Sequence, residues 1–186
     1  MVRTSTIKGS DKAVSIGGFR DVTINDVDKL LSSLSRAISP VVFQIFDATR
    51  IAGWRHLYMA AVNAVGAFES GTTISRGLGI EVLLYASCQD QISRALDVVG
   101  VGPDTEKLAL IVLWDVPGEA EAAFDKAADI LGIADDSVLG LDETKFREVA
   151  KVFGVLENEL EAVGGERDEA LISLLVEKGA LLPLRH

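Results

Sequence analysis

The residues that most often carry out chemistry in proteins are few in this chain and are not grouped. Of its 186 residues, two are histidines, His56 and His186, and one is a cysteine, Cys88. A serine–histidine–acid triad would have to use His56, yet no nucleophile motif points to that residue. A single cysteine can form neither an internal disulfide nor a thiolate metal cluster. We therefore expect no catalytic residue, no metal site and no cofactor.

Phosphate-binding motifs are also missing. The segment Gly77-Leu78-Gly79 resembles the start of a dinucleotide fingerprint, but it follows no predicted strand and lies inside a predicted helix. The formal net charge of −10 opposes autonomous binding to a phosphate backbone or to an anionic membrane. These observations favour a protein that is not an enzyme and that acts by binding other macromolecules.

Candidate binding residues come from a sparse polar set in an apolar region. Glu81 is the single charge inside the predicted helix 76–87, so its carboxylate needs a cation or a hydrogen-bond donor. Each polar side chain of this region could be satisfied within the core, which is the commoner case, or could contact a partner or a stacked base. The candidate site residues are His56, Asn63, Arg76, Glu81, Tyr85, Gln91 and Arg94.

The elements that would position these residues follow from apolar periodicity and from capping and breaking residues. The sequence predicts helices over residues 26–37, 54–70, 76–87, 89–99, 117–131, 143–153 and 169–178, with Ser75 and Ser87 as caps of the third and fourth. It predicts strands over residues 13–19, 41–46, 108–114, 138–141 and 180–184. Because strands and helices alternate irregularly, we expect an α+β fold: a two-layer α/β sandwich with a small mixed sheet and helices mainly on one face.

Helices 54–70 and 76–87 are unusually apolar, and residues 56–68 include no acidic residue, lysine or arginine. A helix that is apolar all round is buried on all sides or is exposed only at an interface. We expect a partner to cover what the fold leaves bare. The predicted inward face of the first helix comprises Leu57, Ala60, Ala61, Ala64, Val65 and Phe68.

The chain is expected to form one domain over residues 1–186, with a flexible acidic connection at 157–168. The amino terminus has no signal-peptide pattern, and no apolar run approaches the ~20 residues that span a bilayer. We therefore expect a cytoplasmic protein without membrane contact. Asparagine and glutamine occur three times each, a scarcity that favours a thermophilic source, and we expect an archaeal protein.

Residues 46–100 resemble the kinase-binding subunit of the KEOPS complex, the family of the human PRPK-binding protein. The motifs that carry the resemblance are Asp47-Ala48, Trp54 with His56-Leu57, the alanine-rich helix to Phe68, Gly71, Ile74-Ser75, Glu81 with Leu83-Leu84-Tyr85, Ser87 and Gln91-Ile92. The pattern extends more loosely to residues 108–114 and 179–184.

The resemblance implies a compact α/β sandwich with no catalytic activity of its own. Such a subunit binds the amino-terminal lobe of the small KEOPS kinase, an ATPase that in turn holds the threonylcarbamoyl transferase subunit. It stimulates the complex, which makes threonylcarbamoyl-adenosine in tRNA, and it helps recruit tRNA through the 3′ CCA end. Family members typically carry a basic residue before Gln-Ile, whereas this chain has Asp90 before Gln91-Ile92. Arg94, Arg76 or Arg55 could compensate.

Two other hypotheses come from different classes. One is a regulatory domain that binds a small ligand between the apolar helices. The other is an enzyme that uses Glu81 and His56.

Overall fold

The computed structural model describes residues 3–185, and within them an antiparallel sheet forms the centre of the molecule. The strand order is β1 (Arg3–Thr6), β2 (Ala13–Arg20), β4 (Leu108–Trp114) and β3 (Val42–Asp47), and β5 (Ile133–Ala134) pairs with β2. All the pairings in the described part of the sheet are antiparallel. The α+β class is confirmed, and the predicted mixed sheet is wrong.

The position of β4 explains why no parallel pairing occurs in this sheet. Strand β4 lies between β2 and β3 and is antiparallel to both, with Leu110 opposite Gly17 on one side and Ile45 on the other. Strands β2 and β3, which helix α1 (Val27–Ile38) connects, therefore run in the same direction without touching. The most apolar strand occupies the centre, where both faces are covered.

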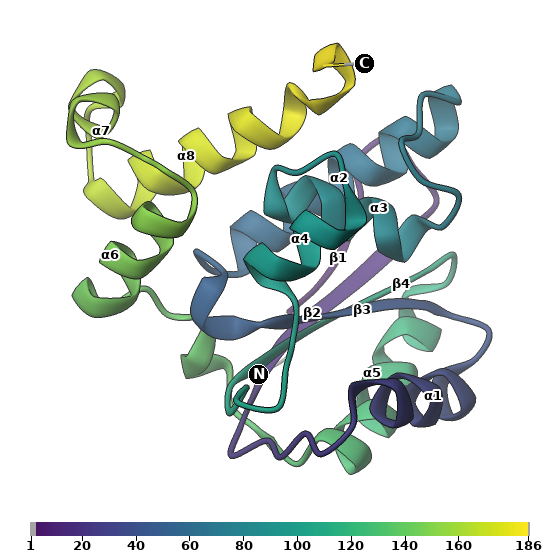
Figure 1. Ribbon diagram of the computed structural model, residues 1–186. Helices are drawn as coiled ribbons and strands as arrows, with labels where there is room; N and C mark the ends of the chain where they lie inside the picture. Colours follow the sequence, from purple (N-terminus) through teal and green to yellow (C-terminus); the bar gives the residue numbers. More distant parts are fainter. Residues whose placement is uncertain (1–2, 186) are drawn as a thin grey trace.

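Helices cover both faces of the sheet (Figure 1), so the fold has three layers rather than the predicted two. On one face lie α1 and α5 (Pro117–Leu131), whose core includes Leu34, Phe124 and Val112. On the other lie α2 (Trp54–Ser70) and α3 (Leu78–Ser87), which share a core with Phe46 and Ile111. Helix α4 (Ile92–Val99) packs against α3.

The carboxyl-terminal third of the chain builds a smaller cluster beside the sheet. The cluster follows the short turn η2 (Asp136–Leu139) and comprises α6 (Glu143–Val152), α7 (Glu157–Val163), α8 (Arg167–Ala180) and η3 (Leu182–Arg185). Another short turn, η1 (Ala48–Arg50), follows β3 and contacts α6. Phe146, Leu171 and Leu175 form the apolar centre of the cluster. Helix α8 also packs on α2 and α3 (Figure 1), so α3 lies between the sheet and α8.

Two glycines allow α3 to be held this closely. A β-carbon at Gly79 would lie 2.7 Å from the carbonyl oxygen of Phe43 in β3, and one at Gly179 of α8 would lie 2.8 Å from that of Tyr85. Both contacts are with backbone, which cannot rotate away. The position of α3 between its two neighbours is therefore fixed by close backbone approach.

Two predicted strands are wrong. Residues 138–139 form the end of η2 and residues 140–141 lie in the loop after it, because the Asp135 carboxylate accepts the Ser137 N–H and turns the chain there, while β5 takes the place beside β2. Residues 180–184 continue from α8 into η3, with the Leu181 N–H donating to the Glu177 carbonyl. Helix α8 lies over other helices, so its end has no sheet edge to join.

Several predicted helix limits also change. Helix α3 begins two residues later than predicted, and α4 begins at Ile92 with Gln91 as its N-cap, while Ser87 ends α3 and does not cap α4. Phe68 was expected to face inward, yet it is 36% exposed. Residues 157–163 of the predicted acidic connection are helical, and the flexibility of this segment stays a prediction.

Candidate partner-binding surface

Helix α3 is enclosed by its own chain. All of its residues from Glu81 to Ser87 are buried, and the helix contacts α2, α4, α8 and β3. Its lack of charge is therefore explained by the fold, and the expectation that a partner covers this helix is wrong. The structure settles the choice between a helix buried on all sides and an interface helix in favour of burial.

Some of the large apolar side chains that remain exposed lie at the margins of this helical layer, while others, such as Ile133 of β5, lie elsewhere. At the end of α8, Leu181 is 43% exposed and Leu184 in η3 is 79% exposed. At the end of α2, Phe68 is exposed too, while Val62 and Asn63 on the outer side of that helix are half-buried. Because α8 packs on α2, both helices contribute to one side of the molecule.

Helix α4 presents a second exposed apolar pair. Ile92 and Leu96 are 47% and 51% exposed and lie one turn apart, whereas Ala95 and Val99 face the core. Gln91, the N-cap of α4, and Arg94, on the opposite side of the helix from this pair, are also exposed. Neither Gln91 nor Arg94 makes a side-chain hydrogen bond or ion pair with the described part of the chain. An arginine guanidinium can stack on a base and can contact a backbone phosphate, so Arg94 suits a single-stranded nucleic-acid end.

Glu81 is satisfied by donors of the loop that joins α2 to α3. Its Oε1 accepts the Ile74 N–H at 3.0 Å, and its Oε2 accepts the Ser75 N–H and the Ser75 hydroxyl at 2.7 Å each. The carboxylate is fully buried, and no cation pairs with it among residues 3–185. The predicted need for donors is met, and Glu81 acts by holding the loop that carries Arg76.

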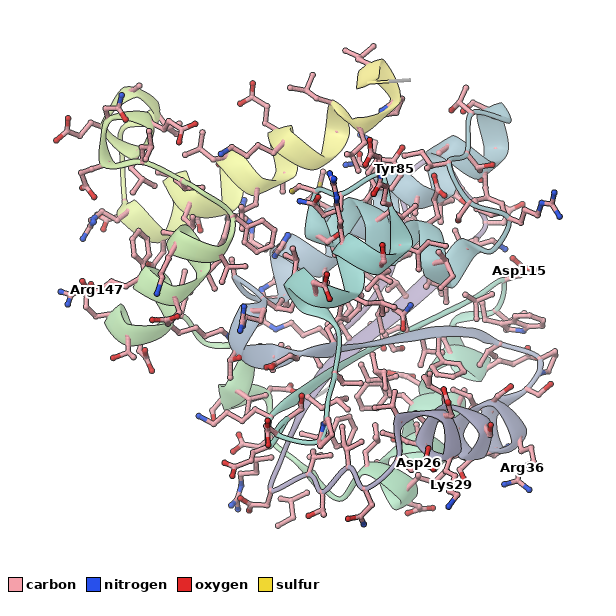
Figure 2. All side chains as sticks on the ribbon, in the orientation of Figure 1. Asp26, Lys29, Arg36, Tyr85, Asp115 and Arg147 are labelled. Carbon is pink, nitrogen blue, oxygen red and sulfur yellow. The ribbon has the colours of Figure 1, made fainter. Side chains whose placement is uncertain are left out.

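Tyr85 and Arg76 lie near this loop but differ in exposure. Tyr85 is buried on α3 and lies on the side of α8 (Figure 2), one turn after Glu81. Burial raises the pKa of the Tyr85 phenol, and the neighbouring Glu81 carboxylate raises it further. Arg76 is exposed in the loop itself. Arg76 is therefore available to a partner, whereas Tyr85 mainly packs.

His56 is buried in the first turn of α2, at the junction with α6. Its Nδ1 accepts the Ala52 N–H at 3.3 Å, and the ring meets Phe153 edge-on, with centroids 5.7 Å apart. Burial lowers the His56 pKa from 6.5 to about 4; the Ala86 carbonyl partly offsets this, and Lys145 adds to it. Because Nδ1 accepts, Nε2 carries the ring proton, and this N–H donates no hydrogen bond of ordinary geometry to residues 3–185. The ring is a neutral core group.

The seven predicted site residues thus separate by exposure. Gln91, Arg94 and Arg76 reach the surface and Asn63 is half-buried, while the other three, His56, Glu81 and Tyr85, are buried. The apolar residues Leu181, Leu184, Ile92 and Leu96 were not predicted as site residues. No local signal set Ile92 and Leu96 apart, because they lie at one edge of the same apolar helix face as Ala95 and Val99.

A family model described as kinase binding protein CGI-121 matches residues 19–178 of this chain. The match includes all of α1 to α7 and most of α8. The chain belongs to this family. The regulatory protein Cgi121 of Methanocaldococcus jannaschii is 30% identical to it over 114 residues, which cover 61% of this chain and 70% of that protein. The resemblance predicted from residues 46–100 is confirmed.

This member of the CGI-121 family keeps its candidate surfaces within or beside the matched region. The α4 residues Ile92, Arg94 and Leu96 lie inside it, and Leu181 and Leu184 follow its end by a few residues. No helix in residues 3–185 is long and apolar enough to cross a membrane.

Proposed function

We propose that this protein is a non-catalytic KEOPS subunit that binds and stimulates the small kinase subunit, through which it is linked to the threonylcarbamoyl transferase subunit. The observation that carries the proposal is the family match over residues 19–178, whose description names kinase binding. The burial of His56 and Glu81 supports a non-catalytic role, because neither side chain can meet a substrate. The dense packing of α2 against α3 gives no support to a small ligand between them.

The kinase is proposed to dock on the ends of α2 and α8. Leu181, Leu184 and Phe68 supply exposed apolar area there, and apolar anchors near the centre of an interface contribute most of its affinity. An acidic chain with a net charge of −10 would suit a partner lobe with basic residues at the rim.

The double variant Leu181→Asp, Leu184→Asp is expected to bind the KEOPS kinase about 100-fold more weakly, because two anchors would be replaced by charges that must be desolvated. Calorimetric titration of the kinase measures the affinity, and its ATP turnover measures stimulation. Ile133→Asp is the matched control, since Ile133 is 50% exposed on β5, away from the helical layer. Separate elution of the unaltered proteins at micromolar concentrations would contradict kinase binding. Loss of binding only in Leu96→Asp would instead place the kinase on α4.

We further propose that the start of α4 holds the tRNA 3′ end within the complex. Gln91 and Arg94 are exposed there and have no side-chain partner among residues 3–185, so both offer polar contacts, and the planar Arg94 guanidinium can also stack on a base. Asp90, half-buried just before Gln91, places a carboxylate where the family resemblance implies a basic residue. The affinity of this chain for tRNA should accordingly be limited by Asp90.

Asp90→Arg is expected to raise the tRNA affinity of the assembled complex about tenfold, because it replaces a repulsive charge with a phosphate contact. Filter binding at fixed salt measures the change, and a tRNA lacking its CCA end should show no gain. Arg94→Glu should have the opposite effect, whereas the exposed α6 residue Arg147, changed to Glu, should have none. Equal affinity of all three variants would contradict the proposed tRNA site.

A further inference from the structure

A cavity of about 380 Å³ lies where η1, η2 and the first turns of α6 meet, apart from both proposed surfaces. Its lining brings together three cations from separate segments: Arg50 of η1, Lys107 just before β4 and Lys145 of α6. The hydroxyl residues Thr49, Ser137 and Thr144 also line it. Such a grouping is unexpected in a chain with a net charge of −10.

Two of these cations have no partner among residues 3–185. Neither the Arg50 guanidinium nor the Lys107 ammonium makes a hydrogen bond or an ion pair there. Asp47, the carboxylate nearest to Arg50 in the sequence, is directed to Thr49: its Oδ1 accepts the Thr49 N–H at 2.9 Å and the Thr49 hydroxyl at 2.6 Å. Glu106, next to Lys107, is exposed and makes no ion pair with residues 3–185. The donors of Arg50 and Lys107 are therefore available to a ligand.

The third cation is held at the cavity wall. The Lys145 Nζ donates to the Val138 carbonyl at 2.8 Å, which uses one of the three N–H donors of an ammonium group. Burial lowers the pKa of Lys145 to about 8; Asp142 and Asp47 raise it in part, and Lys107 lowers it further. Lys145 is mostly protonated at pH 7, and a bound anion would stabilise this partly desolvated charge.

Two carboxylates, Asp142 and Glu148, belong to the same lining. Asp142 caps α6 by accepting the Lys145 backbone N–H at 2.8 Å, so it is directed to the helix. With three cations against two acids, the lining carries a small positive charge that a single compact anion would neutralise. A polyanion would also be repelled by a chain whose formal net charge is −10, which disfavours nucleic acid.

We propose that this cavity binds a small phosphorylated molecule whose phosphate is held by Arg50, Lys107 and Lys145. A guanidinium matches two phosphate oxygens with parallel N–H groups, and the two ammonium groups add point charges. The hydroxyls of Ser137 and Thr144 supply further donors. A cavity of about 380 Å³ has room for more than a phosphate group, so the phosphate ester of a small organic molecule fits better than the free ion.

The test is calorimetric titration of the full chain with inorganic phosphate, inorganic pyrophosphate and adenosine monophosphate, with ionic strength held constant by potassium chloride. At least one of the three is expected to bind, and Lys107→Gln or Arg50→Gln is expected to weaken that binding about tenfold or more. The matched control is Arg147→Gln, because Arg147 lies on the same helix α6 and points outward (Figure 2). The affinity of the Arg147→Gln variant for the probe should equal that of the unaltered protein.

The three probes separate a site for the free ion from a site for a phosphate ester. A site for a phosphate ester should bind adenosine monophosphate more tightly than inorganic phosphate or pyrophosphate. No binding of any probe at about 10 mM would overturn the proposal, since this bounds the affinity at a biologically weak level. Unchanged affinity in both Lys107→Gln and Arg50→Gln would overturn it as well. Binding of a glutamate-rich peptide in place of all three probes would overturn the ligand class. The proposed kinase-binding surface includes none of these residues, so the outcome of this test does not depend on kinase binding.

Discussion

Replacement of Glu81 with alanine is expected to lower the free energy of unfolding by about 4 kcal/mol. The change removes an acceptor of three hydrogen bonds, from the Ile74 N–H, the Ser75 N–H and the Ser75 hydroxyl. Hydrogen bonds to a charged group contribute about 1.5–3 kcal/mol each, and partial exposure of the loop lets water replace some of that loss. The midpoint of thermal unfolding should fall by about 10 °C.

Urea denaturation measures this loss, and Glu69→Ala is the matched control. Glu69 is exposed near the end of α2 and makes no hydrogen bond or ion pair with the described residues, so its replacement should change stability by less than about 0.5 kcal/mol. Glu81→Gln keeps one carbonyl oxygen and should lose roughly half as much as alanine. Hydrogen exchange should quicken at Ile74 and Ser75 first. Equal stability of the two alanine variants would show that the loop does not depend on Glu81.

Acidification from pH 7 to pH 4 is expected to remove about 3 kcal/mol of stability through His56 alone. Burial lowers the folded-state pKa of His56 from 6.5 to about 4, so the folded protein keeps the ring neutral while the unfolded chain protonates it. The contribution is therefore complete above pH 6.5 and is lost as the pH falls toward 4. Protonation would also place a proton on Nδ1, which accepts the Ala52 N–H.

The comparison of the unaltered protein with His56→Gln isolates this contribution. Glutamine stays neutral at all these pH values and can still accept from Ala52, whereas carboxylates and the second histidine, His186, titrate alike in both proteins. Denaturation at pH 7, 6, 5 and 4 should give a steeper loss in the unaltered protein, with slopes that differ by up to about 1.4 kcal/mol per pH unit. Parallel curves would mean that His56 is not neutral in the fold.

Both expectations concern buried polar groups that hold together the helices on which the proposed surfaces lie. Glu81 fixes the loop that carries Arg76, and His56 lies where α2 meets α6. Loss of either group could reduce kinase or tRNA binding without any direct contact. Stability should therefore be measured before a binding defect in these variants is interpreted.

Local sequence determined most of the elements. Apolar periodicity predicted α1, α2, α5 and α6 within one or two residues, and β-branched runs predicted β2, β3 and β4. These patterns depend on neighbours within one or two turns, which the sequence shows directly. The motifs around Glu81 and Gln91 were sufficient for the family. The need of Glu81 for hydrogen-bond donors also followed from its apolar surroundings alone.

What only the tertiary structure decided are relations between distant segments. The insertion of β4 between β2 and β3 turned an expected mixed sheet into an antiparallel one, and register with a distant strand leaves no local pattern. The placement of α8 over α3 buried a helix that the sequence could equally have left for a partner. Because α8 lies over other helices, the segment predicted as the last strand is helical instead, with Leu181 and Leu184 exposed. An apolar helix has the same sequence whether its own fold or another protein covers it, because the hydrophobic effect depends on the area removed from water and not on which chain removes it.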